Sequence, residues 1–283
     1  MHLGGIYMVD IILDTLIDGI KLLPFLFIVF FVLEYIEHKV SIKNKKIIEK
    51  SGNYGPFIGA ILGMFPQCGF SVAATNLFSA RVITFGTLIA IYLSTSDEML
   101  PILLSNGLPI TFILKIMLIK VIIGMTAGFI IDYLLKNKIS LKSIHDICEE
   151  EHCDCKHSLI KSTIKHTLNI FSFIIITSFI LNTLIFLIGE DNLGKLLLKG
   201  NIFAPLLASL IGLIPNCASS ILLSELYLSS TISFGSMMAG LLTGSGVALL
   251  VLFKTNKNVK ENIFILGSIY FIGSIVGLII NLW

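Results

Sequence analysis

Long apolar segments separated by short polar stretches run through most of the chain. A helix that crosses the roughly 30 Å hydrocarbon core of a bilayer needs about 20 mainly apolar residues. We expect apolar helical segments over 9–37, 54–79, 82–96 and 107–135, and again over 163–188, 201–228, 231–253 and 262–282. The pattern predicts an all-α polytopic integral membrane protein with roughly eight to ten membrane segments.

The chain contains an internal sequence repeat. The residues GMFPQC at 63–68 return as GLIPNC at 212–217, an offset of 149 positions (217 − 68 = 149). The same register continues without a gap from 56/205 to 96/245, with identities that include 71/220, 85/234 and 86/235. We interpret the chain as two pseudo-symmetric membrane repeats, residues 1–135 and 163–283, joined by a cytoplasmic Cys/His-rich linker at 136–162.

Each repeat carries a proline inside an apolar segment. Pro66 and Pro215 remove a backbone donor and clash with the preceding helical turn, so each segment should break there. Lipid cannot satisfy the freed carbonyl groups, and a break is tolerated only where it is buried in protein or lines a wet cavity. Paired interrupted segments in two halves point to the substrate site of a secondary transporter. The candidate substrate-binding residues are Pro66, Gln67, Cys68, Ser71, Pro215, Asn216, Cys217 and Ser220. The simpler interpretation is that proline and glycine kink the helices and that the cysteines pack as small apolar residues.

Composition supports the membrane assignment. Hydrophobic residues make up 55% and charged residues 13% of the chain, whereas an ordinary soluble domain has about 25% charged residues. The mean hydropathy is +0.93. The formal net charge of +2 gives no reason to expect nucleic acid as a partner, and membrane lipid is the expected surrounding.

Basic residues cluster in three loops, at 39–50, 136–165 and 254–260. The positive-inside rule favours the cytoplasm for all three loops. The rule is satisfied when each broken segment enters the membrane and returns to its own side, so that each half crosses three times. The two repeats are then inverted relative to one another, which is a known transporter plan. Five crossings in each half would also give inversion, with 99–104 as part of an extra segment.

A short stretch between the repeats is rich in cysteine and histidine. Its candidate metal ligands are His145, Cys148, His152, Cys153, Cys155 and His157. Thiolate and imidazole groups bind Zn²⁺, Cu⁺ and other soft or borderline ions. The spacing fits no standard zinc finger, so we expect a flexible capture or sensing loop. The alternative is a polar linker in which these residue types are incidental.

Charged residues at membrane depth are costly and often functional. Lys120 lies inside an apolar run and needs a counter-charge, for which Asp97, Glu98 and Glu225 are candidates. A carboxylate beside a lysine can exchange protons or be released when substrate binds. We assign these four residues to charge compensation or proton coupling, with water-facing helix ends as the alternative for Asp97 and Glu98.

Motifs of common enzyme classes do not occur in the sequence. There is no H-E-x-x-H, no G-x-S-x-G and no nucleotide fingerprint. The stretch 189–196 has the glycine and lysine spacing of a phosphate loop but lacks the final Ser or Thr. We therefore expect neither an enzyme nor an ATPase, and no required cofactor.

Three of these features together resemble a known family. The duplicated P-[QN]-C motifs, the stretch Ser94-Thr95-Ser96-Asp97-Glu98 and the Cys/His loop are similar to those of the ten-transmembrane heavy-metal exporters, relatives of the arsenical permeases. The resemblance covers nearly the whole chain. It implies efflux of arsenic or another heavy metal, and some members are labelled manganese transporters.

The sequence thus predicts a secondary transporter in the cell membrane that exports arsenic(III) or another heavy metal without ATP. A trivalent arsenic species prefers thiols, which favours Cys68 and Cys217. A first alternative is an exporter of Mn²⁺ or another hard cation, in which oxygen ligands from the carboxylates and amides bind the ion. A second alternative is a membrane metal sensor or scaffold that does not transport, with its chemistry confined to 145–157. Assembly as a homo-oligomer stays open.

Overall fold

The computed structural model describes residues 54–65, 68–96, 99–135, 203–216 and 218–282, with further helical residues between 20 and 31 and between 164 and 183. Helices and their connections make up these ranges, and no strand occurs within them. In this part of the chain, the helical stretches long and apolar enough to cross a membrane are Phe85–Ser105, Ile110–Leu135, Phe234–Thr255 and Val259–Leu282. The first and third of these stretches each contain two helices in succession. The prediction of an all-α polytopic membrane protein is confirmed.

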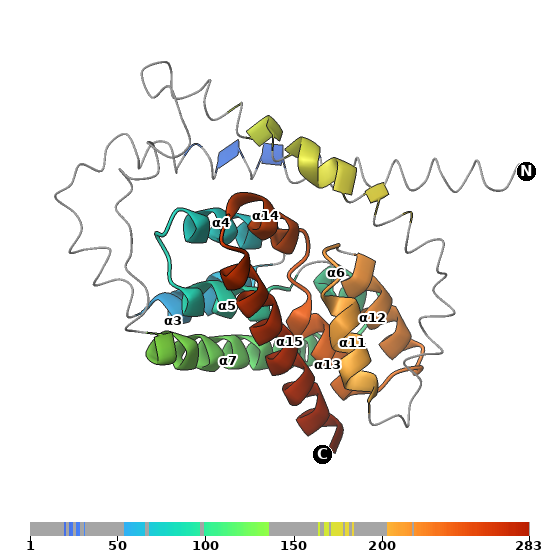
Figure 1. The fold of residues 1–283 in the computed structure, drawn as a ribbon. Helices are drawn as coiled ribbons and strands as arrows, with labels where there is room; N and C mark the ends of the chain where they lie inside the picture. The colour runs from blue at the N-terminus through green and yellow to red at the C-terminus, as the bar shows by residue number, and fades with distance from the viewer. Residues whose placement is uncertain are drawn as a thin grey trace, which may run out of the picture.

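The described helices of the two halves follow one order (Figure 1). The first half contains α3 (Gly55–Gly63), α4 (Cys68–Ser79), α5 (Phe85–Ser94), α6 (Met99–Ser105) and α7 (Ile110–Leu135). The second half contains α11 (Ala204–Gly212), α12 (Ala218–Leu228), α13 (Phe234–Thr243), α14 (Ala248–Thr255) and α15 (Val259–Leu282). Four of these helix starts recur at one offset, because 204 − 55, 234 − 85, 248 − 99 and 259 − 110 all equal 149.

Matching residues also begin and end matching helices. Thr84 accepts a hydrogen bond from the Thr87 amide at the start of α5, and Ser233 accepts one from the Ser236 amide at the start of α13, both at 3.1 Å. A hydroxyl in this position satisfies an amide that has no partner within the helix. After α4 and α12, the chain turns through Arg81 (φ 58°) and Ser230 (φ 60°), and 230 − 81 is again 149.

The helices α3 and α4 form a hairpin on α5. The start of α3 lies beside the start of α5, because a Cβ atom added to Gly55 would meet Thr87. The end of α3 lies beside the end of α5, where a Cβ on Gly63 would meet Ser94. Helices α3 and α5 therefore run parallel to each other.

The return helix α4 runs antiparallel to α5. The hydroxyl oxygens of Thr75 and Tyr92 are 2.5 Å apart near the end of α5. The rings of Phe78 and Phe85 meet edge to face at 4.7 Å at its start. The hairpin thus begins and ends at the same end of α5, which is the geometry that a segment returning to its own side requires.

The second half repeats this arrangement. A Cβ on Gly212, at the end of α11, would meet Thr243 at the end of α13. The return helix α12 brings the Tyr227 ring to 5.9 Å from the Phe234 ring at the start of α13. The helices α11 and α12 form a second hairpin, with its turn near the end of α13.

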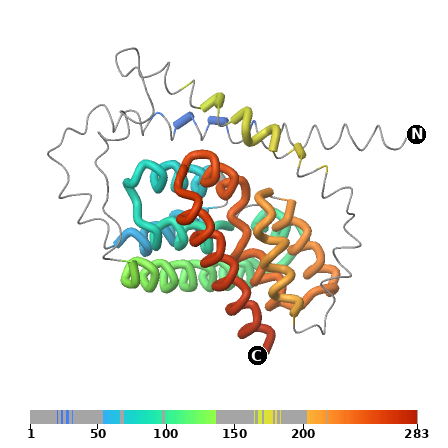
Figure 2. Tube along the Cα trace, viewed as in Figure 1, coloured from blue at the N-terminus to red at the C-terminus, as the bar shows by residue number. Residues whose placement is uncertain are grey.

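The spans α5–α6 of the first half and α13–α14 of the second half run in opposite directions. Tyr92, near the end of α5, donates to the carbonyl of Ala248 at the start of α14 (3.3 Å). The end of α14 reaches the end of α4, where the Thr255 and Ser79 hydroxyl oxygens lie 2.7 Å apart. Since α4 runs antiparallel to α5, the span α13–α14 is antiparallel to α5–α6. The first half and the orange-to-red second half interleave, with α4 beside α14 and α12 beside α6 (Figure 2).

Glycines allow the closest helix crossings. A Cβ on Gly128 of α7 would lie 2.5 Å from the Gly86 carbonyl oxygen, and one on Gly277 of α15 would lie 2.7 Å from the Gly235 carbonyl oxygen. Residues with a side chain do not fit at these distances. Backbone contact therefore fixes α7 on α5 and α15 on α13.

The outer faces of α7 and α15 are apolar. Exposed residues include Leu114, Leu118, Ile122 and Ile130 on α7, and Ile263, Phe271, Ile275 and Ile279 on α15. In water such continuous apolar rows would be a liability. They suit helices that face lipid.

One helix prediction is wrong. The segment 231–253 was expected to be continuous, but it is divided between α13 and α14 by a break over 244–247. Gly244 leaves the helical region, and Gly246 has a left-handed φ of 56°. The expected helix over 82–96 corresponds to α5, which ends at Ser94, and α6 follows in the same span at the position of the extra segment considered at 99–104.

Candidate substrate site

The turn of the first hairpin lies between α3 and α4. The amides of Met64 and Phe65 donate to the carbonyls of Ile61 and Leu62, both at 3.2 Å, and close the helix with a tight final turn. Beyond the turn, Pro66 and Gln67 lie outside the described residues, and Cys68 is described only as the first backbone residue of α4. Their role in substrate binding stays a prediction.

The turn of the second hairpin contains Pro215 and Asn216, whereas Cys217 lies outside the described residues. Asn216 is 7% exposed. Its side-chain oxygen accepts a hydrogen bond from the Ala218 amide (3.4 Å), and its carbonyl accepts one from the Ser219 hydroxyl (2.8 Å). Asn216 therefore accepts hydrogen bonds from the first residues of α12, which holds a predicted ligand at the start of a half-helix.

Ser71 and Ser220 occupy matching positions in the first turns of α4 and α12. Both are buried. The carbonyl of Ser71 accepts from the Thr75 hydroxyl (2.7 Å), and the carbonyl of Ser220 accepts from the Ser224 hydroxyl (2.8 Å). These two predicted ligands thus stand on equivalent turns, one after each proline.

Each half has a second break. The sequence prediction anticipated the first, as the end of the helix over 82–96, and missed the second, inside 231–253. The first follows α5, where Thr95 leaves the helical region, and Asp97 and Glu98 lie outside the described residues. The second covers 244–247. Hydroxyl-bearing residues line both and are buried: Ser94, Thr95, Ser96, Thr243 and Ser245. The clustered small polar residues Ser94-Thr95-Ser96 and Thr243-Gly244-Ser245-Gly246 were the available signal.

The hairpin turns and the second breaks lie at the same level of the bundle. Gly63, which ends α3, packs on Ser94 and on the Ile91 carbonyl. Gly212, which ends α11, packs on Thr243 and on the Gly240 carbonyl. Within each half, two chain breaks are therefore neighbours. Helices α3, α5, α11 and α13 end near these breaks, and α4, α6, α12 and α14 begin near them. Carbonyl and amide dipoles therefore converge there.

Two side chains join the breaks of the opposite halves. Tyr92 bridges Thr75 and the Ala248 carbonyl. Lys120 is 1% exposed and donates to the carbonyls of Thr95, in the first half, and Leu241, in the second. The sequence singled out Lys120 as a buried charge, but these backbone partners were not predictable.

The other charged candidates lie elsewhere or outside the described residues. Glu225 is exposed on α12. The predicted metal ligands between the repeats, from His145 to His157, also fall outside the described residues. In the described ranges, no group of three or more His, Cys, Asp or Glu side chains could hold a metal ion.

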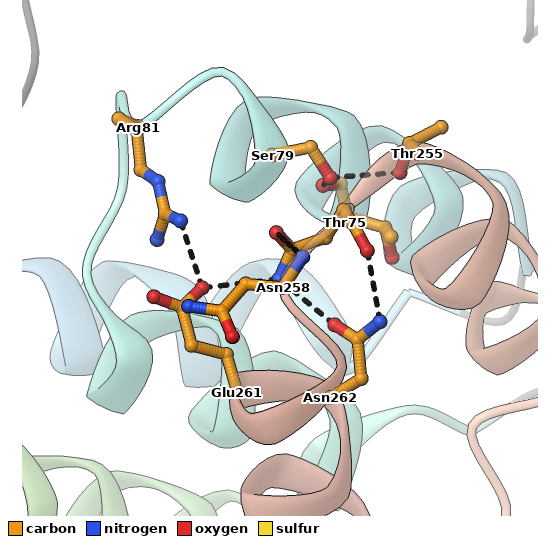
Figure 3. A network of polar contacts seen from close by, with 8 residues as sticks. Thr75, Ser79, Arg81, Thr255, Asn258, Glu261 and Asn262 are labelled. Carbon is orange, nitrogen blue, oxygen red and sulfur yellow. Dashed lines mark hydrogen bonds and ion pairs between the residues drawn. The ribbon is translucent and has the colours of Figure 1, made fainter.

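A polar network outside the candidate site was also missed. We call it the polar corner, and it consists of Ser79, Arg81, Thr255, Asn256, Glu261 and Asn262; all of these except Asn256 are labelled in Figure 3. Arg81 pairs with Glu261 at 2.8 Å, and Asn256 donates to Glu261 (3.1 Å) and to Asn262 (2.8 Å). It ties the end of the first hairpin to the connection between α14 and α15, and no motif in the sequence marks it.

The model of the family described as "Putative, 10TM heavy-metal exporter" matches residues 7–196 and 169–283. No curated protein and no solved structure showed a significant match to the chain.

Proposed function

The chain belongs to the family of ten-transmembrane heavy-metal exporters, and from this premise we propose that it is a secondary transporter that moves arsenic(III) or another heavy-metal ion out of the cell. The match to the family supports export of a heavy metal. The choice of arsenic rests on the two cysteines that follow the prolines, since trivalent arsenic prefers thiols.

The observation that carries the proposal is the meeting of two hairpin turns with two helix breaks. Each hairpin returns to the end of the bundle at which it began, and the spans α5–α6 and α13–α14 run in opposite directions. Secondary transporters with inverted repeats bind substrate near the bilayer midplane, at discontinuous helices. The geometry supports two inverted copies around one central site.

The basic loops support an orientation. Three connections lie at the end of the bundle where α5 begins. Tyr54 lies there because the adjacent Gly55 packs on Thr87, and Leu135 lies there because Asp132 accepts from the Gly86 amide (2.8 Å). The connection 256–258 lies there because Arg81 pairs with Glu261. The basic stretches 39–50, 136–165 and 254–260 adjoin these positions. By the positive-inside rule, this end faces the cytoplasm of a cell-membrane protein.

In the proposed site, Cys68 and Cys217 bind the ion, and Gln67 and Asn216 with Ser71 and Ser220 complete its surroundings. Asp97, Glu98 and Glu225, together with Lys120, compensate charge or exchange protons during transport. The Cys/His stretch at 145–157 collects the ion on the cytoplasmic side. These roles rest on residue chemistry and on matching positions in the two repeats.

One observation favours a second substrate class. The hydroxyls of Ser94, Thr95, Ser96, Thr243 and Ser245 are buried around the two breaks, and backbone carbonyls lie close by. Oxygen ligands suit Mn²⁺ and other hard cations better than thiols do. Export of a hard divalent cation, with the cysteines as packing residues, is therefore the alternative.

Uptake of As(III) and of Mn²⁺ into everted vesicles tests the proposal. The native chain is compared with Cys68→Ser/Cys217→Ser, and the matched control is Cys148→Ser/Cys153→Ser/Cys155→Ser, which removes three thiols outside the repeats. We expect arsenic uptake that disappears in the first variant. In the control, uptake should continue and should be slower only at low arsenic concentration, because the Cys/His stretch collects the ion but does not form the central site. Manganese uptake that survives the first variant would favour the alternative. If the native protein, inserted in the vesicle membrane, takes up neither ion, the result contradicts both arsenic export and hard-cation export.

A further inference from the structure

Lys120 occupies an unusual position for a charged side chain. It lies in the middle of α7, inside the membrane span 110–135, and is 1% exposed. Its ammonium group donates to the carbonyl oxygen of Leu241 at 2.7 Å and to that of Thr95. A buried ammonium is costly unless such acceptors surround it.

Both acceptors belong to the C-terminal ends of half-helices. Thr95 directly follows α5, and Leu241 lies in the last turn of α13, which ends at Thr243. The last carbonyls of a helix have no partner within it and carry a partial negative charge. Two such ends, one from each half, converge on one ammonium group.

This carbonyl geometry is the kind that binds a coupling cation in other transporters. Unwound backbone carbonyls and half-helix C-termini coordinate Na⁺ where helices are interrupted at membrane depth. In this chain the ammonium group of Lys120, a cation that is part of the protein, binds these carbonyl oxygens. The ammonium supplies one positive charge and several donors, as a bound Na⁺ would supply one charge to the same oxygens.

The pseudo-equivalent position has no charge. Residue 269 matches Lys120 (120 + 149 = 269) and is isoleucine, 0% exposed on α15. The first break therefore has its cation built into α7, whereas the matching place in the second half is apolar. The two halves share their backbone plan but differ at this position.

We propose that Lys120 is a resident cation that takes the place of a coupling Na⁺ at the first break. The protein consequently transports its substrate without Na⁺, and Lys120 holds the ends of α5 and α13 together while the substrate occupies the central site. The role in transport rests on the proposed function, but the cation site itself can be tested without any transport assay.

The test is the thermal unfolding midpoint of the purified protein in detergent, measured in NaCl, KCl and choline chloride at equal ionic strength. The native midpoint is expected to be the same in all three salts. Lys120→Ala removes the ammonium and opens space at the carbonyls, so its midpoint should fall and should recover by several degrees in NaCl or KCl relative to choline chloride. Ile269→Ala is the matched control, because it opens a comparable space without freeing these carbonyls, and should respond equally to all three salts.

A Lys120→Ala midpoint that does not distinguish the small cations from choline would overturn the proposal. If this variant does not fold, the native protein alone decides. A native midpoint that rises specifically with Na⁺, or substrate uptake that requires Na⁺, would contradict a resident cation. If the salt response is as expected but the protein transports no metal, the result contradicts the proposed function and still supports the cation site.

Discussion

The two ends of the bundle are built on one backbone plan but are held by different chemistry. At one end, Arg81 pairs with Glu261 beside the edge-to-face rings of Phe78 and Phe85. At the other end, Phe112 occupies the position equivalent to Glu261 (112 + 149 = 261). There it packs with Tyr227 and Phe234, the equivalents of Phe78 and Phe85; we call these three residues the aromatic corner.

The distances show the contrast. In the aromatic corner, the ring of Phe112 lies 6.3 Å from that of Tyr227 and 5.8 Å from that of Phe234. In the polar corner, the corresponding contacts are an ion pair and directional amide hydrogen bonds. Packing of rings tolerates sliding, whereas hydrogen bonds lose their strength when they are misaligned. We infer that the helix crossing α4–α14 is fixed more firmly than the crossing α12–α6.

The glycine crossings are what both halves share, and breaking them should have the largest effect. Gly128→Ala and Gly277→Ala each place a methyl group against a backbone carbonyl of the facing helix. We expect a similar loss of stability in both, of about 3 kcal/mol, the upper end for overpacking. The measurement is thermal unfolding in detergent.

Gly267→Ala is the control for this prediction. It lies in the same helix as Gly277, but a Cβ there meets nothing within 4 Å. The added alanine should leave stability unchanged or raise it by up to about 1 kcal/mol through helix propensity. Equal losses at 267 and 277 would show that the close crossing is not the cause.

The polar corner depends next on Asn262, which is 1% exposed. Asn262→Leu removes one of the two acceptors of the Asn256 side-chain amide, which keeps Glu261, and the side-chain donor to the Asn256 carbonyl, at an expected cost of about 2 kcal/mol. Its equivalent in the first half is Ile113 (113 + 149 = 262), and Ile113→Leu should cost less than about 1.5 kcal/mol because volume is conserved. Equal unfolding midpoints for these two variants would remove the distinction between the corners.

The ion pair itself should contribute less. Arg81 and Glu261 are 21% and 22% exposed, so solvent screens them, and Arg81→Gln or Glu261→Gln should cost no more than about 1 kcal/mol. The exchange Arg81→Glu/Glu261→Arg should recover part of the loss, and the recovery should shrink at high salt. A double variant no more stable than the single ones would mean that the pairing does not contribute.

Glu225 should have the smallest effect on stability, although it breaks the symmetry of the repeats. Its equivalent is Asn76 (76 + 149 = 225), which is buried and donates to the Val72 carbonyl at 3.1 Å. Glu225→Asn copies the first half at an exposed position, so stability should change by less than about 0.5 kcal/mol. If Glu225 carries the coupling charge, uptake into everted vesicles should nevertheless fall sharply. Unchanged uptake would exclude that role.

The features predictable from the sequence are those that local chemistry determines. Pro66 and Pro215 forecast the hairpin turns, because proline breaks a helix wherever it lies in the interior. The break after Ser94 was anticipated, because the polar stretch Ser94-Thr95-Ser96-Asp97-Glu98 ended the predicted helix over 82–96 close to it. The break over 244–247 was missed because long apolar stretches flank it on both sides and no proline interrupts them. Glycine and hydroxyl residues gave only a weak signal there.

The contacts that define the site could not be read from one sequence. Lys120 was recognisable as a buried charge, but its acceptor Leu241 is 121 positions away, and a backbone carbonyl leaves no trace in residue identity. The pair of Arg81 and Glu261 was missed for the same reason, since each residue alone resembles an ordinary helix end. Pseudo-symmetry would have suggested Phe112 and Glu261 as equivalents, but not that one would pair with Arg81.

The central claim is that both hairpin turns line one substrate site, and thiol protection tests it most directly. In a Cys148→Ser/Cys153→Ser/Cys155→Ser background, the rates at which a thiol reagent modifies Cys68 and Cys217 are measured against increasing As(III) or Mn²⁺. The account predicts that one of these ions protects both cysteines, with the same half-saturating concentration. Protection of only one cysteine, or of neither at concentrations that support transport, would contradict a shared site.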